Sequence, residues 1–277
     1  MTDQPPFPIR MIAIDLDGTL LRSDRSIGSR TIDALHAAQA NGVEIVFASG
    51  RSMQTMEATA SAFNFDTFLV SCNGAEVHSR RSEGRKRLLH YPLNAAVARD
   101  LVAFAKQRRY QVNFYHEDVI VSEDGPHLRP WIDLYRLRTG ARYKLVEQID
   151  AYLQHAPTKL LFIVATNERD AIVKELRTRV ASKATLVCTE AEYVEFLNPG
   201  VDKWQGVTSV AEILHINKTA IMALGDGEND VKMLEMASWG VAVANACTAC
   251  KAVANAVTKN DHNNDAVAEA VERWVHV

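Results

Sequence analysis

Short apolar runs without alternation recur along the chain, as expected for strands buried on both faces of a parallel sheet. The pattern predicts such strands at residues 11–14, 43–48, 67–72, 219–224 and 240–244. Segments with helical spacing or helix-capping residues follow them, at residues 31–41, 52–63, 202–214, 231–237 and 265–275. Strands that alternate with helices indicate an α/β fold, here a doubly wound, Rossmann-like core with a parallel sheet.

The pattern changes in the middle of the chain, where strands and helices are grouped and no longer alternate strictly. It predicts helices at residues 95–109 and 168–180, a hairpin at residues 111–123 around His116, Glu117 and Asp118, and strands at residues 159–165, 185–189 and 193–197. Residues 122–130, which contain two prolines, are predicted to be a loop. Grouped elements indicate an inserted α+β domain. We therefore expect a core made of residues 1–84 and 190–277, with a second domain at residues 85–189.

Two acidic segments follow predicted strands of the core. Asp15 and Asp17 come directly after the first strand, and Gly18 allows a sharp turn there. Asp226 and Asp230 follow the strand at residues 219–224. Each segment alone is also compatible with an acidic turn that caps a helix. Because ligands of open α/β sheets bind beyond the carboxyl ends of the strands, two such segments in one sheet favour a functional site.

These segments carry a resemblance to a known family. Residues 15–20 (DLDGTL) resemble the first motif of the haloacid dehalogenase superfamily, D-x-D-G-T-L, and residues 225–230 (GDGEND) resemble its fourth motif, G-D-x-x-N-D. The resemblance implies that Asp15 is a nucleophile that becomes an aspartyl phosphate, and that Asp17 is the general acid and base. It implies Mg²⁺ as cofactor, held by Asp15, the Asp17 carbonyl and Asp226, with Asp230 in direct or indirect support. A hard cation with oxygen ligands suits a carboxylate that attacks a phosphate dianion.

The same resemblance assigns four phosphate-binding residues. Ser49 and Gly50 end the second strand and match the second motif; a hydroxyl and nearby N–H groups could bind a phosphoryl oxygen, although a serine that only caps a helix would fit the same position. Lys203 stands where the family has a lysine that pairs with the nucleophile and the phosphate, but Trp204 follows it where the family usually has glycine. Asn229 of the fourth motif is the remaining candidate, for phosphate or for metal.

Further similarity points to the Cof-type subgroup of sugar-phosphate phosphatases. Residues 71–75 (SCNGA) fit its N-G-A segment, and residues 265–268 (DAVA) resemble its D-G-V-A, with Ala266 in place of glycine. The insertion after the second motif is typical of this subgroup, where it is a cap that selects the substrate. The resemblance implies a phosphatase acting on a sugar phosphate or a phosphorylated cofactor. A phosphomutase, a dehalogenase and a non-enzymatic ligand sensor stay open as alternatives.

Composition narrows the classes of partner. The 277 residues carry a formal net charge of -3, which gives no general basic footprint for nucleic acid. The N-terminal residues lack the pattern of a signal peptide, and no apolar run has membrane-spanning length. We expect a cytoplasmic protein whose partner is a small phosphorylated metabolite, with no nucleic acid and no membrane. The oligomeric state leaves no mark in the sequence.

Cysteine usage adds one motif, the C-x-x-C formed by Cys247 and Cys250. A zinc site would require two more ligands at a recognisable spacing, and no second C-x-x-C exists in the sequence. A redox motif would be expected near the start of a helix after an early strand, whereas this pair lies late in the chain. We therefore expect packed thiols on a helix.

Overall fold

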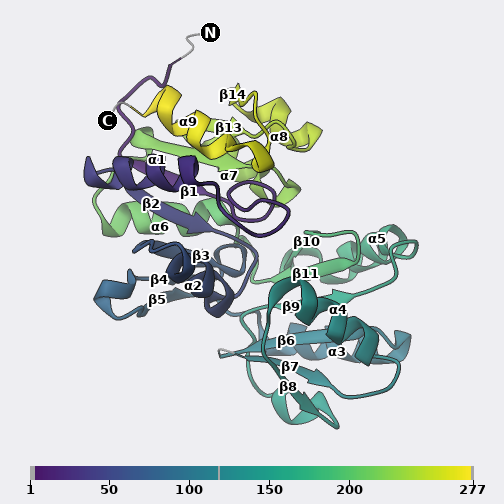
Figure 1. Ribbon diagram of the computed structural model, residues 1–277. Coiled ribbons are helices and arrows are strands. Elements are labelled where there is room, and N and C mark those ends of the chain that lie inside the picture. Colours follow the sequence, from purple (N-terminus) through teal and green to yellow (C-terminus); the bar gives the residue numbers. More distant parts are fainter. Residues whose placement is uncertain (1–3, 118, 276–277) are drawn as a thin grey trace. The chain divides into compact units, whose positions relative to one another are not determined.

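The computed structural model describes residues 4–117 and 119–275, and it divides into two compact units (Figure 1). The core unit contains the described parts of residues 1–50, 56–88 and 202–277. The inserted unit contains residues 51–55 and the described parts of residues 89–201. The core unit is thus assembled from both ends of the chain, and each unit has a sheet of its own.

The sheet of the core unit is parallel except at one edge. Its strand order is β14-β13-β12-β1-β2-β3-β4-β5. Neighbours from β14 to β3 pair in parallel, and β4 pairs antiparallel with β3. The bounds are β1 Met11–Ile14, β2 Glu44–Ala48, β3 Phe68–Ser71, β4 Glu76–His78, β5 Arg87–His90, β12 Ile221–Gly225, β13 Trp239–Ala242 and β14 Ala256–Val257. The central strands β1, β3 and β12 are buried throughout, which explains their continuous apolar runs.

Helices complete the core unit. They are α1 Ser29–Ala40, α2 Met53–Ala62, α6 Lys203–Ile213, α7 Val231–Met236, α8 Thr248–Val253 and α9 Ala266–Trp274. The first residues of α2 fall in the segment 51–55, which is grouped with the inserted unit. α1 packs against α9, while α6 packs against α7 and against β2 and β3. None of the helices in the described part of the chain combines the length and the apolar character needed to cross a bilayer. The predicted fold class, a doubly wound α/β core with an inserted α+β domain, is confirmed.

The inserted unit has a mostly antiparallel sheet with the order β10-β11-β9-β6-β7-β8. Its strands are β6 Gln111–His116, β7 Val119–Glu123, β8 Tyr143–Val146, β9 Leu160–Ile163, β10 Thr185–Val187 and β11 Tyr193–Leu197, and its helices are α3 Ala95–Arg108, α4 Arg129–Thr139 and α5 Arg169–Val180. Alternate strand residues such as Val112, Phe114 and Phe162 form one buried cluster with Leu101 of α3 and Leu176 of α5. This cluster gives the inserted unit a hydrophobic core of its own.

Three features of the inserted unit differ from the sequence-based expectation. α4 begins at Arg129, inside the segment expected to be a loop, because Pro130 stands in the first helical turn, where its missing N–H costs no hydrogen bond. β8 was not predicted either. The second boundary lies near residue 201, later than the expected 189, since β11 pairs with β9 and β10. Asp118, which we expected in the hairpin turn, lies outside the described residues.

Candidate active site

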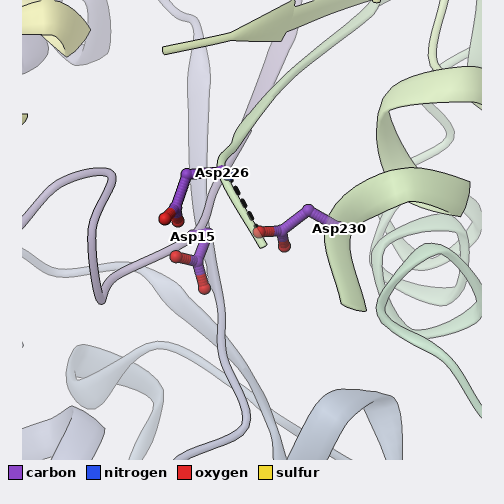
Figure 2. Close-up of side chains that lie close together, drawn as sticks. All are labelled: Asp15, Asp226 and Asp230. Carbon is purple, nitrogen blue, oxygen red and sulfur yellow. Dashed lines mark hydrogen bonds between the residues drawn. The ribbon is translucent and has the colours of Figure 1, made fainter. Parts of the chain in front are cut away.

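Three carboxylates meet where two neighbouring strands of the core sheet end. β1 and β12 pair in parallel with Ile14 opposite Leu224, so Asp15 and Asp226 emerge at the same edge. Asp230 reaches the same place from the turn that precedes α7 (Figure 2). One oxygen from each of the three carboxylates lies within 4.8 Å of the others. Asp15 and Asp226 are 211 residues apart in the sequence. The two acidic motifs therefore come together in one cluster.

Lys203 joins this cluster from α6. Its ammonium nitrogen lies 2.5 Å from Asp15 Oδ1 and 2.6 Å from Asp230 Oδ1, and only 1% of the residue is exposed. The helix starts at Lys203 because the Asp202 side chain caps it, accepting a hydrogen bond from the Gln205 N–H at 2.8 Å. Trp204, which departs from the family pattern, is itself buried and does not keep Lys203 from Asp15.

The cluster holds more negative than positive charge. Burial, the repulsion from Asp230 and the nearby Asp226 raise the pKa of Asp15 well above its usual range, against the lowering effect of Lys203. Burial and Asp230 raise the pKa of Asp226 to about 6. Burial disfavours the Lys203 ammonium, but Asp15 and Asp230 outweigh it and raise its pKa, so the lysine stays charged. One ammonium thus faces three carboxylates.

This donor set fits a divalent cation. Three carboxylates and one ammonium leave a formal excess of two negative charges, and burial together with the repulsion among the carboxylates raises the pKa of Asp15 and Asp226. Carboxylate oxygens are the ligands that hard cations such as Mg²⁺ prefer. A bound dication would offset the excess without any change in the residues present.

Asp230 differs from the other two carboxylates because its oxygens already have partners. Oδ1 accepts from Lys203. Oδ2 accepts from the backbone N–H of Asp226 at 3.1 Å (Figure 2) and from that of Gly227 at 3.0 Å. These bonds shape the turn that carries Asp226. The geometry therefore favours a supporting role for Asp230, one of the two roles expected from the sequence.

The Asp226 carboxylate is positioned by the loop after β1. Thr19, a residue to which sequence reasoning gave no role, donates from its hydroxyl to Asp226 Oδ1 at 3.0 Å. Gly18 has a φ of +77°, and a Cβ built there would lie 2.4 Å from Asp226 Oδ2. Glycine is required at this position both by its backbone conformation and by the close approach of the carboxylate. The D-G-T part of the first motif thus has a structural reason.

Asp17 stands apart from the cluster. Its side chain is exposed, whereas Asp15, two residues earlier, is 4% exposed. The group of three close carboxylates does not include it. The Asp17 carboxyl group is therefore open to solvent, whereas the Asp15 carboxyl group is enclosed.

The remaining predicted residues are brought together by a residue that sequence reasoning left without a role. Ser49, which is 2% exposed, follows β2, and its carbonyl accepts from the Asn73 N–H at 2.9 Å. Asn229 donates from Nδ2 to Asn73 Oδ1 at 3.0 Å. A Cβ built on Gly50 would lie 3.2 Å from Asn73 Nδ2. The sequence signal for Asn73 was the match of residues 71–75 to the N-G-A segment of the subgroup, which gave this residue no role in the site.

The C-x-x-C pair lies beside this site. Cys247 caps α8, with its sulfur accepting from the Cys250 N–H at 3.5 Å. The buried Cys250 thiol donates to the Gly227 carbonyl oxygen at 3.0 Å. No disulfide joins any of the four cysteines, all of which lie in the described part of the chain. The Cys250 thiol therefore packs against the turn that carries Asp226, while the Cys247 sulfur caps the start of α8.

Comparison with known proteins identifies the family. The model of the haloacid dehalogenase-like hydrolases matches residues 12–271. The chain is 26% identical over 268 residues to the 5-amino-6-(5-phospho-D-ribitylamino)uracil phosphatase YcsE of Bacillus subtilis, covering 96% of each chain. It is 28% identical over 242 residues to the HMP-PP phosphatase of Cronobacter sakazakii, covering 86% of this chain and 85% of that one.

Two further matches complete the comparison. The chain is 27% identical to part of the chloroplastic endoribonuclease YBEY of Arabidopsis thaliana; the match covers 95% of this chain but only about half, 46%, of that longer protein. The crystal structure of a haloacid dehalogenase-like hydrolase from Bacteroides thetaiotaomicron superposes with a TM-score of 0.85 at 27% identity, covering 96% of this chain and 99% of that one. The resemblance drawn from the motifs is confirmed, and the chain belongs to the haloacid dehalogenase-like hydrolase family.

Proposed function

We propose that the protein is a Mg²⁺-dependent phosphatase that hydrolyses a small phosphorylated metabolite, a sugar phosphate or a phosphorylated cofactor, through an aspartyl phosphate. The observation that carries the proposal is the contact of the buried Lys203 with Asp15 and Asp230 beside Asp226. Phosphatase names among the relatives support the same reaction class. This is the arrangement that a nucleophilic carboxylate requires in order to approach a phosphate dianion.

In the first half of the reaction, an oxygen of Asp15 attacks phosphorus. The Lys203 ammonium holds Asp15 Oδ1, which orients the carboxylate, and its charge stabilises the phosphoryl group as negative charge moves toward the leaving oxygen. The new Asp15–phosphorus bond forms as the bond from phosphorus to the leaving oxygen breaks. Asp17 gives its proton to that oxygen, so the product leaves as a neutral alcohol.

In the second half, Asp17 takes a proton from water, the water oxygen attacks phosphorus, and the bond to Asp15 breaks. Inorganic phosphate leaves and Asp15 is restored. Asp15, the Asp17 carbonyl and Asp226 would hold Mg²⁺ with Asp230 in support, and the cation supplies positive charge that offsets the repulsion between Asp15 and the phosphate dianion. Ser49, Gly50 and Asn229 bind phosphoryl oxygens.

The inserted unit would act as the cap that selects the leaving group. It interrupts the core between the second motif and Lys203, and it has its own sheet and hydrophobic core. A folded insertion of this kind can carry substrate contacts without disturbing the catalytic residues. We assign the choice of metabolite to the inserted unit and the phosphoryl chemistry to the core unit.

A phosphatase screen tests the proposal. Purified protein is incubated with sugar phosphates, nucleotides, pyridoxal phosphate and an aryl phosphate, with Mg²⁺ or with excess chelator. We expect release of inorganic phosphate that stops in chelator and returns with added Mg²⁺. Full activity in excess chelator would contradict the metal-dependent mechanism. Formation of an isomeric sugar phosphate without release of phosphate would identify a phosphomutase instead.

A further inference from the structure

The turn after β3, Cys72–Gly74, has an unusual backbone. Three consecutive residues lie in the left-handed region, with φ of 49° at Cys72, 54° at Asn73 and 97° at Gly74. Two of the three are not glycine, and both are almost completely buried. Non-glycine residues in this region are strained and persist only where surrounding contacts hold them. Three sets of contacts hold this turn.

The turn contacts the end of β2. The Asn73 N–H donates to the Ser49 carbonyl at 2.9 Å, and the Ser49 N–H donates to the Val70 carbonyl at 2.9 Å. The Asn73 side chain lies against Gly50, because a Cβ built on that glycine would be 3.2 Å from Asn73 Nδ2. Backbone and side chain of Asn73 thus fix the segment that is predicted to bind phosphate with Ser49 and Gly50.

The turn also contacts the loop after β12. Asn229 is half-buried and is separated from Asn73 by 156 residues, yet its Nδ2 donates to Asn73 Oδ1 at 3.0 Å. Asn229 immediately precedes Asp230, which accepts from Lys203. The Asn73 side chain therefore links Asn229 to the Ser49–Gly50 segment, and both are predicted to bind phosphate.

The third contact is with the start of α6. A Cβ built on Gly74 would lie 2.1 Å from the Asp202 carbonyl oxygen and 3.4 Å from the Lys203 nitrogen. A Cβ built on Gly206 would lie 3.2 Å from Gly74 Cα. The turn and the first turn of α6 therefore meet backbone to backbone. Three elements that carry Ser49, Asn229 and Lys203 converge on this one turn.

We propose that Asn73 is a positioning residue for phosphoryl binding, which rests on the proposed phosphatase function. The side-chain amide of Asn73 holds Asn229 in a fixed position relative to the Ser49–Gly50 segment. The hydrogen-bond donors of Asn229 and of this segment then face the same phosphoryl group. Asparagine suits the position because its amide offers an acceptor and a donor on one short side chain. It is also among the non-glycine residues that most readily adopt a left-handed conformation.

The test separates the side chain of Asn73 from its backbone. Asn73→Gly keeps the left-handed conformation accessible but removes the amide. Losing one aligned hydrogen bond to a charged group corresponds to roughly tenfold in affinity. We expect KM for an aryl phosphate and the inhibition constant of inorganic phosphate to rise together by about tenfold. A merely structural role would lower the melting temperature and leave the inhibition constant of the folded fraction unchanged.

Asn64→Gly is the matched control, because Asn64 is also left-handed, with a φ of 56°, but is exposed in the loop after α2. It should leave both constants unchanged. The double variant of Asn73→Gly with Asn229→Ala should bind phosphate no more weakly than whichever single variant has the lower phosphate affinity. The reason is that Asn73 acts through Asn229. Additive effects of the two substitutions would overturn the proposal, as would an unchanged inhibition constant in folded Asn73→Gly.

A second variant covers the case in which Asn73→Gly does not fold. Asn73→Asp keeps the shape of the side chain and the acceptor for Asn229, but it places a negative charge beside Gly50. Phosphate binding should therefore weaken at least as much, and wild-type binding by this variant would contradict the proposal. If the wild-type protein neither hydrolyses the aryl phosphate nor binds phosphate, the proposed function fails. Wild-type activity with an indifferent Asn73 variant instead refutes only the positioning role.

Discussion

Two buried lysines, one in each unit, sit in opposite electrostatic situations. Lys159 of the inserted unit is 1% exposed and pairs with Glu195 at 2.7 Å, and its ammonium lies 4.6 Å from the ring centroid of Tyr115. Lys203 of the core unit is equally buried but faces Asp15 and Asp230, with Asp226 close by. The first group is a formally neutral pair, whereas the second has an excess of negative charge.

The difference separates a structural ion pair from a candidate metal site. A neutral buried pair satisfies its own charges, and removing one partner leaves the other uncompensated. In the unbalanced cluster, burial and the repulsion among the carboxylates raise the pKa of Asp15 and Asp226, and the proposed cation would offset the excess negative charge. The two lysines are equally buried, and each lies close to a carboxylate. They differ in the number of negative charges that surround them.

The largest effect that tests this comparison concerns activity. Asp15→Asn removes the proposed nucleophile and should lower kcat by about 10⁶-fold, the scale on which loss of a nucleophile acts. Asp17→Asn keeps the backbone carbonyl and should cost about 10²–10⁴-fold, less for an aryl phosphate whose oxygen leaves readily. Rapid-quench labelling with an alkyl and an aryl phosphate measures both. Equal phosphoenzyme labelling of the two variants would show that the roles are not divided in this way.

Particular residues show how much of the fold and of the candidate site could be predicted from the sequence. The buried strands β1 and β12 were predicted because an apolar run without alternation, bounded by turn residues, is typical of a strand covered on both faces. The meeting of Asp15 with Asp226 could be expected from the rule that strand ends form the site. Lys203 was expected from the resemblance to the family, and the structure brings it to Asp15 despite Trp204.

What the sequence did not indicate depends on contacts between distant segments. The bond between Asn73 and Asn229 joins residues 156 positions apart, and neither position has a pattern that announces the other. The supporting geometry of Asp230 depends on the path of a tight turn, where both oxygens find partners that spacing alone does not predict. The sequence pattern does not indicate α4, because Pro130 is typical of a loop, although proline is tolerated in a first helical turn.

The next effect concerns stability and belongs to the inserted unit. Glu195→Gln leaves the Lys159 ammonium buried beside a neutral amide, and breaking a buried pair in this way typically costs about 3–5 kcal/mol. We expect the free energy of unfolding to fall by that amount, measured by urea denaturation. Arg169→Gln, which breaks an exposed pair with Asp170 in the same unit, is the control and should change stability by less than about 1 kcal/mol. A Glu195→Gln variant as stable as the wild type would remove the contrast between the two lysines.

The smallest effect concerns the melting temperature, where added Mg²⁺ should reverse the effect of one substitution. Asp226→Asn removes one of three neighbouring carboxylates, so in excess chelator this variant should melt at or above the wild-type temperature. Saturation with Mg²⁺ at about 100 times its dissociation constant adds about 2.7 kcal/mol to the wild type, provided that the cation binds the folded state only. The variant lacks one ligand and should gain much less, so that the order of melting temperatures reverses with Mg²⁺. Glu195→Gln should keep the full response to Mg²⁺, because Glu195 belongs to the inserted unit and is not part of the carboxylate cluster. If Mg²⁺ shifts the wild type and Asp226→Asn equally, the excess negative charge around Lys203 is not a metal site.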